Sequence, residues 1–133
     1  MLELLREKLS ALPAVRLAAA FGSVARGEER PGSDLDLGLV LDPDSLELRR
    51  EIEVVLGRAA GREVDFVYLN EASPLLRFEI ARDGVLLLER QPYDWTDFRA
   101  RAMIDWWDWA PTARMITDTI LRRQKERLLG GQA

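Results

Sequence analysis

Hydrophobic and polar positions alternate along the chain in two rhythms, which predict helices and strands. Apolar residues recur at helical spacing in three segments, residues 2–12, 44–60 and 74–83. Short, dense apolar runs that are typical of strands form four further segments, residues 16–21, 34–41, 62–69 and 85–88. Two connections are also informative: residues 23–27 are expected to form a turn or a short helix, and residues 28–32 a polar loop. The order of these elements predicts an α/β fold.

Local sequence signals mark where the helices should begin and end. Asp44 followed by Glu47 resembles a capping box, which predicts that Asp44 opens the second helix. Gly61 is expected to stop that helix, because glycine readily adopts the left-handed conformation that ends helices. Ser73 is placed as an N-cap, with Pro74 in the first helical position, for the third helix.

The last forty residues are predicted to be helical and rich in tryptophan. Residues 93–109 carry a wide apolar stripe, Pro111 is expected to break the helix, and residues 112–129 are expected to form a separate last helix. Three of the four tryptophans fall close together, at Trp106, Trp107 and Trp109. Two interpretations carry equal weight: the indole rings cover the sheet or close an ordinary core, or they form an interface with a partner protein.

Composition narrows the chemistry that the chain can perform. The 133 residues predict a single domain over 1–133, and 47% hydrophobic residues are ordinary for a globular protein. A net charge of −4 without a basic stripe argues against strong nucleic-acid binding. With no cysteine and no histidine, the chain cannot form disulfides, thiolate metal sites or histidine-based catalytic triads. Neither a signal peptide nor a membrane span is evident, so a cytoplasmic location is expected.

One stretch of the sequence combines a phosphate-binding turn with a pair of carboxylates. Gly22-Ser23 follows an apolar run, and its backbone amides and hydroxyl are suited to hold phosphate oxygens. Asp34 and Asp36 stand two residues apart at the start of the next strand, so their side chains share one face, roughly 7 Å apart. Oxygen ligands of this kind suit Mg²⁺. A phosphate cradle beside a metal-binding pair is the arrangement required for phosphoryl or nucleotidyl transfer.

The spacing of these residues resembles that of a known family. Gly22-Ser23, ten intervening residues and then Asp34-Leu35-Asp36 resemble the motif of polymerase-β-like nucleotidyltransferases, and in particular the minimal nucleotidyltransferases. The resemblance covers about residues 15–90, the expected core, with a helical region at about 93–129. It implies an α/β fold with a small mixed β-sheet flanked by helices, with the two aspartate strands adjacent and helices at the C-terminus.

The resemblance also implies a set of catalytic and metal-binding residues. Asp34 and Asp36 would bind two Mg²⁺ ions, and Asp65 on the neighbouring strand would complete the acidic cluster as the third catalytic and metal-binding carboxylate. By itself Asp65 reads as a solvent-facing strand residue, and only the first two aspartates and the resemblance favour the catalytic role. Gly22 and Ser23 would hold the phosphates of a nucleoside triphosphate.

Two further residues of the expected nucleotide-binding set keep alternative roles. Arg26 either neutralises phosphate charge or braces the loop through an ion pair with an acid such as Asp34. Ser33 either caps the turn into the second strand or reaches the metal shell through a water molecule, and the cap is favoured.

Function and partner follow from the resemblance rather than from individual residues. Many minimal nucleotidyltransferases are paired with a helical HEPN-domain protein. The implied activity is Mg²⁺-dependent transfer of AMP from ATP to a hydroxyl, favouring a tyrosine, of a partner HEPN toxin, for which this chain would be the antitoxin. A homo-oligomer is left open. The alternatives are an antitoxin that masks its partner without catalysis, and nucleotidyl transfer to a small molecule, which the short C-terminal region disfavours.

Overall fold

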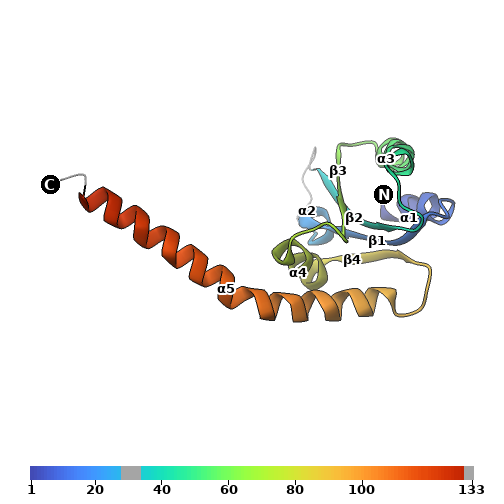
Figure 1. The fold of residues 1–133 in the computed structure, drawn as a ribbon. Helices are drawn as coiled ribbons and strands as arrows, with labels where there is room; N and C mark the ends of the chain where they lie inside the picture. The colour runs from blue at the N-terminus through green and yellow to red at the C-terminus, as the bar shows by residue number, and fades with distance from the viewer. Residues whose placement is uncertain (28–33, 131–133) are drawn as a thin grey trace.

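The structure is a computed structural model that describes residues 1–27 and 34–130. Figure 1 shows its helices and strands, which in chain order are α1 (Leu2–Ser10), β1 (Val15–Phe21), α2 (Gly22–Ala25), β2 (Leu35–Leu41), α3 (Leu46–Ala60), β3 (Val64–Tyr68), α4 (Pro74–Asp83), β4 (Val85–Glu89) and α5 (Asp94–Gly130). The four predicted strands and the first three predicted helices are confirmed to within three residues at their ends. The loop predicted at 28–32 lies outside the described residues, as does Ser33.

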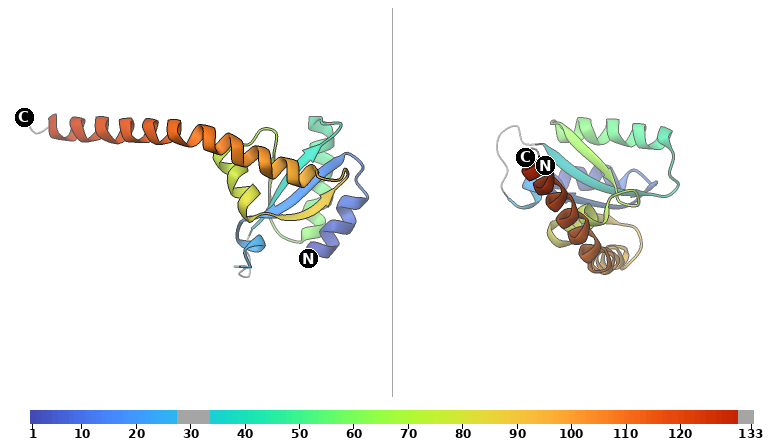
Figure 2. Two further views of the ribbon diagram at one scale, coloured as in Figure 1. Left: turned by 90° about the horizontal axis from the view of Figure 1, so that it is seen from below. Right: turned by 60° about the vertical axis from the view of Figure 1, so that its left-hand side comes forward.

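The strands form one mixed sheet in the order β3-β2-β1-β4. Strand β1 runs antiparallel to β2 and β4, whereas β2 and β3 are parallel. Helices α1 and α3 cover one face of the sheet, and α4 with the first part of α5 covers the other (Figures 1 and 2). The prediction of a small mixed sheet with adjacent aspartate strands is therefore confirmed. Across the described ranges, no helix is long and apolar enough to cross a membrane.

Side chains along β2 alternate between the two faces of the sheet. One face packs on the core, and the other carries the candidate site. Leu35, Leu37 and Leu39 are fully buried against the α1 and α3 side chains. Each such leucine contributes about 1.5–3 kcal/mol on burial, which fixes the register of the strand. With that register set, Asp36 must point to the opposite face, toward the layer of α4 and α5. The hydrophobic pattern thus orients the carboxylate without any contact to the carboxylate itself.

The predicted cap of α3 is wrong by one residue. Ser45, not Asp44, is the N-cap, and its Oγ accepts a hydrogen bond from the backbone N–H of Leu48 at 3.1 Å. Asp44 instead accepts two hydrogen bonds from the guanidinium of Arg49, at 2.7 and 2.8 Å. An arginine five residues away thus draws the aspartate side chain away from the helix end, and the serine takes its place. The predicted cap of α4 is confirmed.

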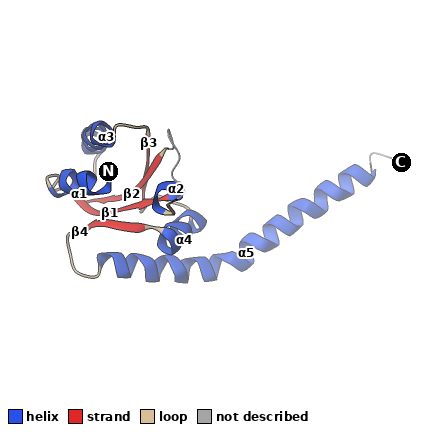
Figure 3. Ribbon diagram, turned by 180° about the vertical axis from the view of Figure 1, so that it is seen from behind, coloured by secondary structure: helices blue, strands red, loops and turns tan. Residues whose placement is uncertain are grey.

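The C-terminal region is one helix and not two. Pro111 lies inside α5, which continues to Gly130, so the predicted break at Pro111 is wrong. Proline removes one backbone donor and crowds the preceding turn, and a helix can absorb this by bending. Figure 1 shows α5 changing direction part-way along, and Figure 3 shows the same continuous helix from behind.

The three clustered tryptophans have different environments. Trp106 stacks on Phe78 of α4 with ring centroids 5.4 Å apart, next to an ion pair of 3.2 Å between Arg77 and Asp105. Trp107 is 70% exposed and Trp109 is 39% exposed. Trp106 therefore helps to join α5 to the domain, as the first interpretation expected. Contact of the other two tryptophans with a partner stays a prediction.

Candidate active site

The predicted aspartates meet at one end of the sheet. Strand β1 ends there at Phe21, α2 follows at once, and β2 and β3 both begin there. Asp34 immediately precedes β2, Asp36 is the second residue of β2, and Asp65 is the second residue of β3. Asp36 and Asp65 are register partners across the parallel β2–β3 pair, so their side chains point to the same face. The structure thus brings Asp65 next to the Asp34–Asp36 pair, from which it is far apart in the chain.

The charges of these side chains act on one another. The pKa of Asp36 is raised above its usual value, first because the carboxyl is half-buried and then because of the negative charges of Asp65 and Asp34. The positive charge of Arg26 opposes this shift. Within residues 1–27 and 34–130, no three His, Cys, Asp or Glu side chains are placed to hold a metal ion. The aspartates are therefore close enough to repel one another but have not converged into a formed metal cage.

Gly22 packs against the Asp36 carboxylate. Its φ is +76°, and a Cβ added to it would lie 2.2 Å from Oδ2 of Asp36. Two independent constraints thus require glycine: the left-handed backbone, and the absence of space for any side chain. The turn that was predicted to hold phosphate is consequently fixed directly beside the carboxylate that was predicted to hold metal.

Replacing Gly22 by alanine should disturb both the fold and the site. We expect Gly22→Ala to lower the free energy of unfolding by about 1–3 kcal/mol, because the methyl group displaces Asp36 and the backbone is strained. Thermal and urea denaturation measure this loss. Gly57→Ala is the matched control, since a Cβ there meets nothing within 4 Å and the residue lies inside α3. The control should be neutral or stabilising by up to about 1 kcal/mol; equal stability of the two variants would contradict the close contact.

Arg26 lies at the edge of the site, just after α2. Its charge acts on Asp36 and also contributes to the lowered pKa of Asp83, whose main cause is a hydrogen bond from Arg82. Arg26 therefore lies between the aspartate cluster and the C-terminal end of α4. Both predicted roles, phosphate binding and bracing of the loop, are consistent with this position. Sequence reasoning treated Asp83 only as a helix end, and no local pattern signals an electrostatic contact between α2 and α4.

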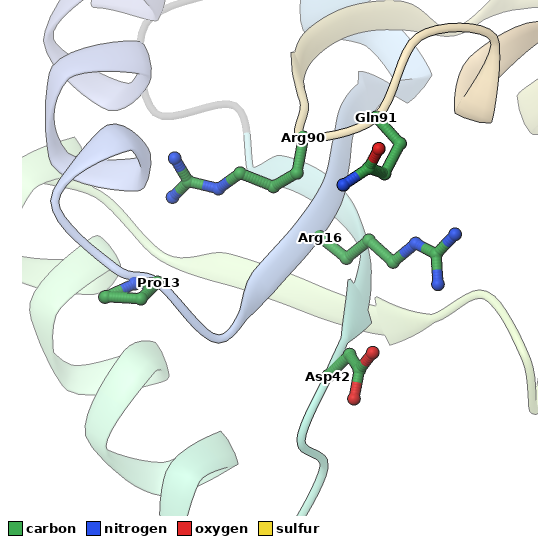
Figure 4. A pocket seen from close by; sticks show the side chains of 5 residues that line it. All are labelled: Pro13, Arg16, Asp42, Arg90 and Gln91. Atoms are coloured by element: carbon green, nitrogen blue, oxygen red, sulfur yellow. The ribbon is translucent and has the colours of Figure 1, made fainter.

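A pocket of about 540 Å³ lies at the opposite end of the sheet (Figure 4). Its lining residues are Pro13, Arg16, Asp42, Arg90 and Gln91. Arg90 turns away from Arg16 and donates hydrogen bonds to the carbonyls of Val15, Leu9 and Leu12, each at 3.0 Å. Arg16 forms an ion pair with Asp94 at 3.2 Å. These cations tie α1, β1 and α5 together, and the pocket is separate from the aspartates, which lie at the other end of β1 and β2.

Comparison with known families agrees with this geometry. Residues 3–93 match the family described as polymerase beta, nucleotidyltransferase. The chain belongs to this nucleotidyltransferase family. The match includes the turn at Gly22, all three aspartates and the whole sheet, so the resemblance inferred from the motif is confirmed.

Relatives with known names are found within the nucleotidyltransferase family. The protein adenylyltransferase MntA of Aphanizomenon flos-aquae is 27% identical over 113 residues, covering 77% of this chain and 75% of MntA. A proposed protein adenylyltransferase of Methanocaldococcus jannaschii is 35% identical over 79 residues, covering 56% of this chain and 81% of the relative.

Solved structures share the fold of this nucleotidyltransferase. A chain of a toxin–antitoxin complex crystallised with AMP-PNP aligns with a TM-score of 0.77 at 23% identity, covering 90% of this chain and 98% of that chain. A chain from a complex of tri-AMPylated Shewanella oneidensis HEPN toxin with its MNT antitoxin aligns with a TM-score of 0.69 at 23% identity, covering 91% and 99%. The predicted fold class, a polymerase-β-like nucleotidyltransferase fold, is confirmed.

Proposed function

We propose that this nucleotidyltransferase transfers AMP from ATP to a hydroxyl group of a HEPN-domain toxin and thereby acts as an antitoxin. The accepting hydroxyl that we favour is that of a tyrosine. The proposal is supported above all by the pairing of Asp36 with Asp65 across β2 and β3, with Asp34 immediately before β2, beside a glycine turn that has no room for a side chain. The relatives named as protein adenylyltransferases, and the fold shared with a complex of an AMPylated HEPN toxin, support the choice of reaction and partner.

The carboxylate set fits magnesium. All the donors are oxygens. Burial and then repulsion from Asp65 and Asp34 raise the pKa of Asp36, and a divalent cation between the carboxylates would relieve the repulsion. Because the carboxylates have not converged into a cage, phosphate oxygens and water would supply the remaining ligands. Mg²⁺ bound there would neutralise triphosphate charge and lower the pKa of the attacking hydroxyl. Asp34 and Asp36 would hold the metal, with Asp65 sharing it on the acceptor side.

The protein side chains would organise a direct displacement at the α-phosphorus of ATP. The acceptor oxygen bonds to the α-phosphorus, the bond from that phosphorus to the bridging oxygen breaks, and pyrophosphate leaves. Asp65 accepts the proton of the acceptor hydroxyl. The backbone at Gly22 and the hydroxyl of Ser23 hold the departing phosphates, and Arg26 is placed to offset their charge. Ser33, which immediately precedes Asp34 in the sequence, would complete the nucleotide-binding set.

An exposed site suits a macromolecular acceptor. Asp34, Asp65 and Arg26 are exposed, and only Asp36 is half-buried. Small-molecule sites usually enclose most of the ligand surface. An open site depends on a second protein to present the hydroxyl and to exclude water, which favours transfer to a protein over transfer to a small molecule.

Metal-dependent nucleotide binding tests the proposed site. We expect calorimetry to show ATP binding in the presence of Mg²⁺ and binding at least ten times weaker in EDTA, because the carboxylates repel the bare triphosphate. The Asp34→Ala/Asp36→Ala variant, measured in parallel, should bind ATP almost equally with and without Mg²⁺. Equal ATP affinity of the wild-type protein in Mg²⁺ and in EDTA would overturn the metal-binding role of these residues.

A further inference from the structure

The C-terminal part of α5 exposes a large amount of apolar surface. We call residues 111–130 the arm. Figures 1 and 2 show the arm leaving the body of the molecule as a single helix. Its large apolar side chains are 46–73% exposed, and they are Met115, Ile116, Ile120, Leu121, Leu128 and Leu129. So many exposed apolar side chains on one helix favour an interaction site.

The apolar stripe of the arm continues the buried face of the same helix. In the first half of α5, residues three or four positions apart pack on the sheet and on α4: Trp95, Phe98, Ala102 and Trp106. The same spacing continues past Pro111 through Ala113, Ile116 and Ile120. The apolar face that packs on the domain in the first half of α5 therefore continues into the arm. Most helical stability in proteins comes from the packing of an apolar face, so a partner that covered this face would stabilise the arm.

Charge selects among the partners that could cover this stripe. The arm carries five basic and two acidic residues, whereas the whole chain carries 23 acidic and 19 basic residues. Arg123 and Arg127 follow Ile116 and Ile120 by seven residues each, so they lie on the same face of the helix and end the apolar stripe with positive charge. Two arms packed together would bring these positive charges into contact, which disfavours a dimer formed by the arms. An apolar groove with an acidic rim complements the arm in both respects.

The arm also lies on the side of the molecule that carries the site. It extends past the end of the sheet at which α2 and the aspartate strands begin (Figures 1 and 3). A protein held by the arm is thus kept beside the aspartates at a high effective concentration. Affinity and catalysis would then reside in separate parts of the chain.

We propose that the arm is the docking helix for the protein that accepts the adenylyl group, and that it binds an apolar groove with an acidic rim on that partner. The inference rests on the proposed function for the identity of the partner, the HEPN-domain protein. It adds the surface by which that partner is recognised and the chemistry that the partner must present.

Association of the 133-residue chain with its purified HEPN-domain partner tests the docking role. We expect Ile116→Asp/Ile120→Asp to weaken the Kd measured by calorimetry at least 100-fold, because two charges enter the apolar interface. Leu46→Asp/Val54→Asp is the matched control, with both residues exposed on α3 at 71% and 51%. The control should bind within about threefold of wild type. Circular dichroism should show both variants folded.

A second variant tests the charge argument separately. Arg123→Glu/Arg127→Glu should weaken association at least tenfold and reduce its dependence on salt. Unchanged Kd values for both arm variants would overturn the proposal. Two results from sedimentation would also overturn it. In the first, the wild-type chain is a dimer and the arm variant loses only dimerisation. In the second, the variant loses only binding to anionic lipid vesicles. If the wild-type chain binds the HEPN protein but adds no adenylyl mass, the proposed activity fails while docking by the arm stands.

Discussion

Replacing Asp34 and Asp36 together by alanine is expected to abolish the proposed adenylyl transfer, while the chain stays folded and bound to its partner. Transfer should fall by about 10³-fold or more, because the variant lacks the carboxylate that packs against the Gly22 turn together with its neighbour Asp34. The wild-type chain at sub-stoichiometric concentration, with ATP and Mg²⁺, should raise the partner mass by adenylyl units. Mass spectrometry and an assay of partner toxicity measure the difference. The arm is intact in this variant, so association should be unchanged.

The direction in which the same variant changes the free energy of unfolding can also be predicted. Because folding raises the pKa of Asp36 above its ordinary value of 3.8, the ionised side chain disfavours the folded state. Wild-type stability should therefore fall as pH rises from 3.8 through the folded pKa, and the variant should lack this loss. At neutral pH the variant is expected to be at least as stable as wild type, with the advantage vanishing in acid. If the double variant neutralises the partner as well as wild type does, and no mass shift is found, the chain acts by masking its partner and not by catalysis.

Replacing Asp65 by asparagine separates nucleotide binding from transfer. Asp65→Asn keeps the shape of the side chain but removes the carboxylate that is proposed to accept the proton of the hydroxyl. We expect the transfer rate to fall by about 10²–10⁴-fold, while the affinity for ATP with Mg²⁺ changes little. Single-turnover kinetics and calorimetry on the same preparation measure the two quantities.

The control for Asp65 is a carboxylate that lies away from the site. Glu51→Gln removes an exposed negative charge from α3, on the other face of the sheet, and should leave both quantities unchanged. Wild-type transfer rates in Asp65→Asn would show that Asp65 is an ordinary surface residue of β3. Loss of ATP binding in the same variant would instead assign Asp65 to the nucleotide and not to the acceptor.

Regular patterns in the sequence predicted most of the fold. Alternation along β2 set the register of the strand, and this register determined the face on which Asp36 lies. Placing Asp65 beside Asp36 needed the family resemblance, because residues 36 and 65 are connected only through the order of the strands. The motif also suggested that Gly22 lies near the aspartates. The contact that excludes a side chain at Gly22 depends on backbone placement and could not be read from residue types.

Errors arose where two local preferences competed. Both Asp44 and Ser45 are suitable N-caps, and the outcome depended on Arg49, whose side chain binds Asp44. At Pro111, the intrinsic tendency to end a helix was weaker than the helical preference of the residues on either side. The role of Arg26 stayed undecided because its neighbours come from α2, β2 and α4. Such contacts depend on the three-dimensional arrangement and leave no periodic signal.

The change of direction along α5 makes this helix a lever (Figure 1). Trp106 on Phe78 anchors the helix before Pro111, and the about 19 residues after Pro111 span roughly 28 Å. A change of about 10° at this single residue would therefore move the tip by about 5 Å without shifting any strand or aspartate. The distance that the arm extends can therefore change at one residue while the aspartates keep their positions. Partner proteins of different size would then meet the same set of carboxylates.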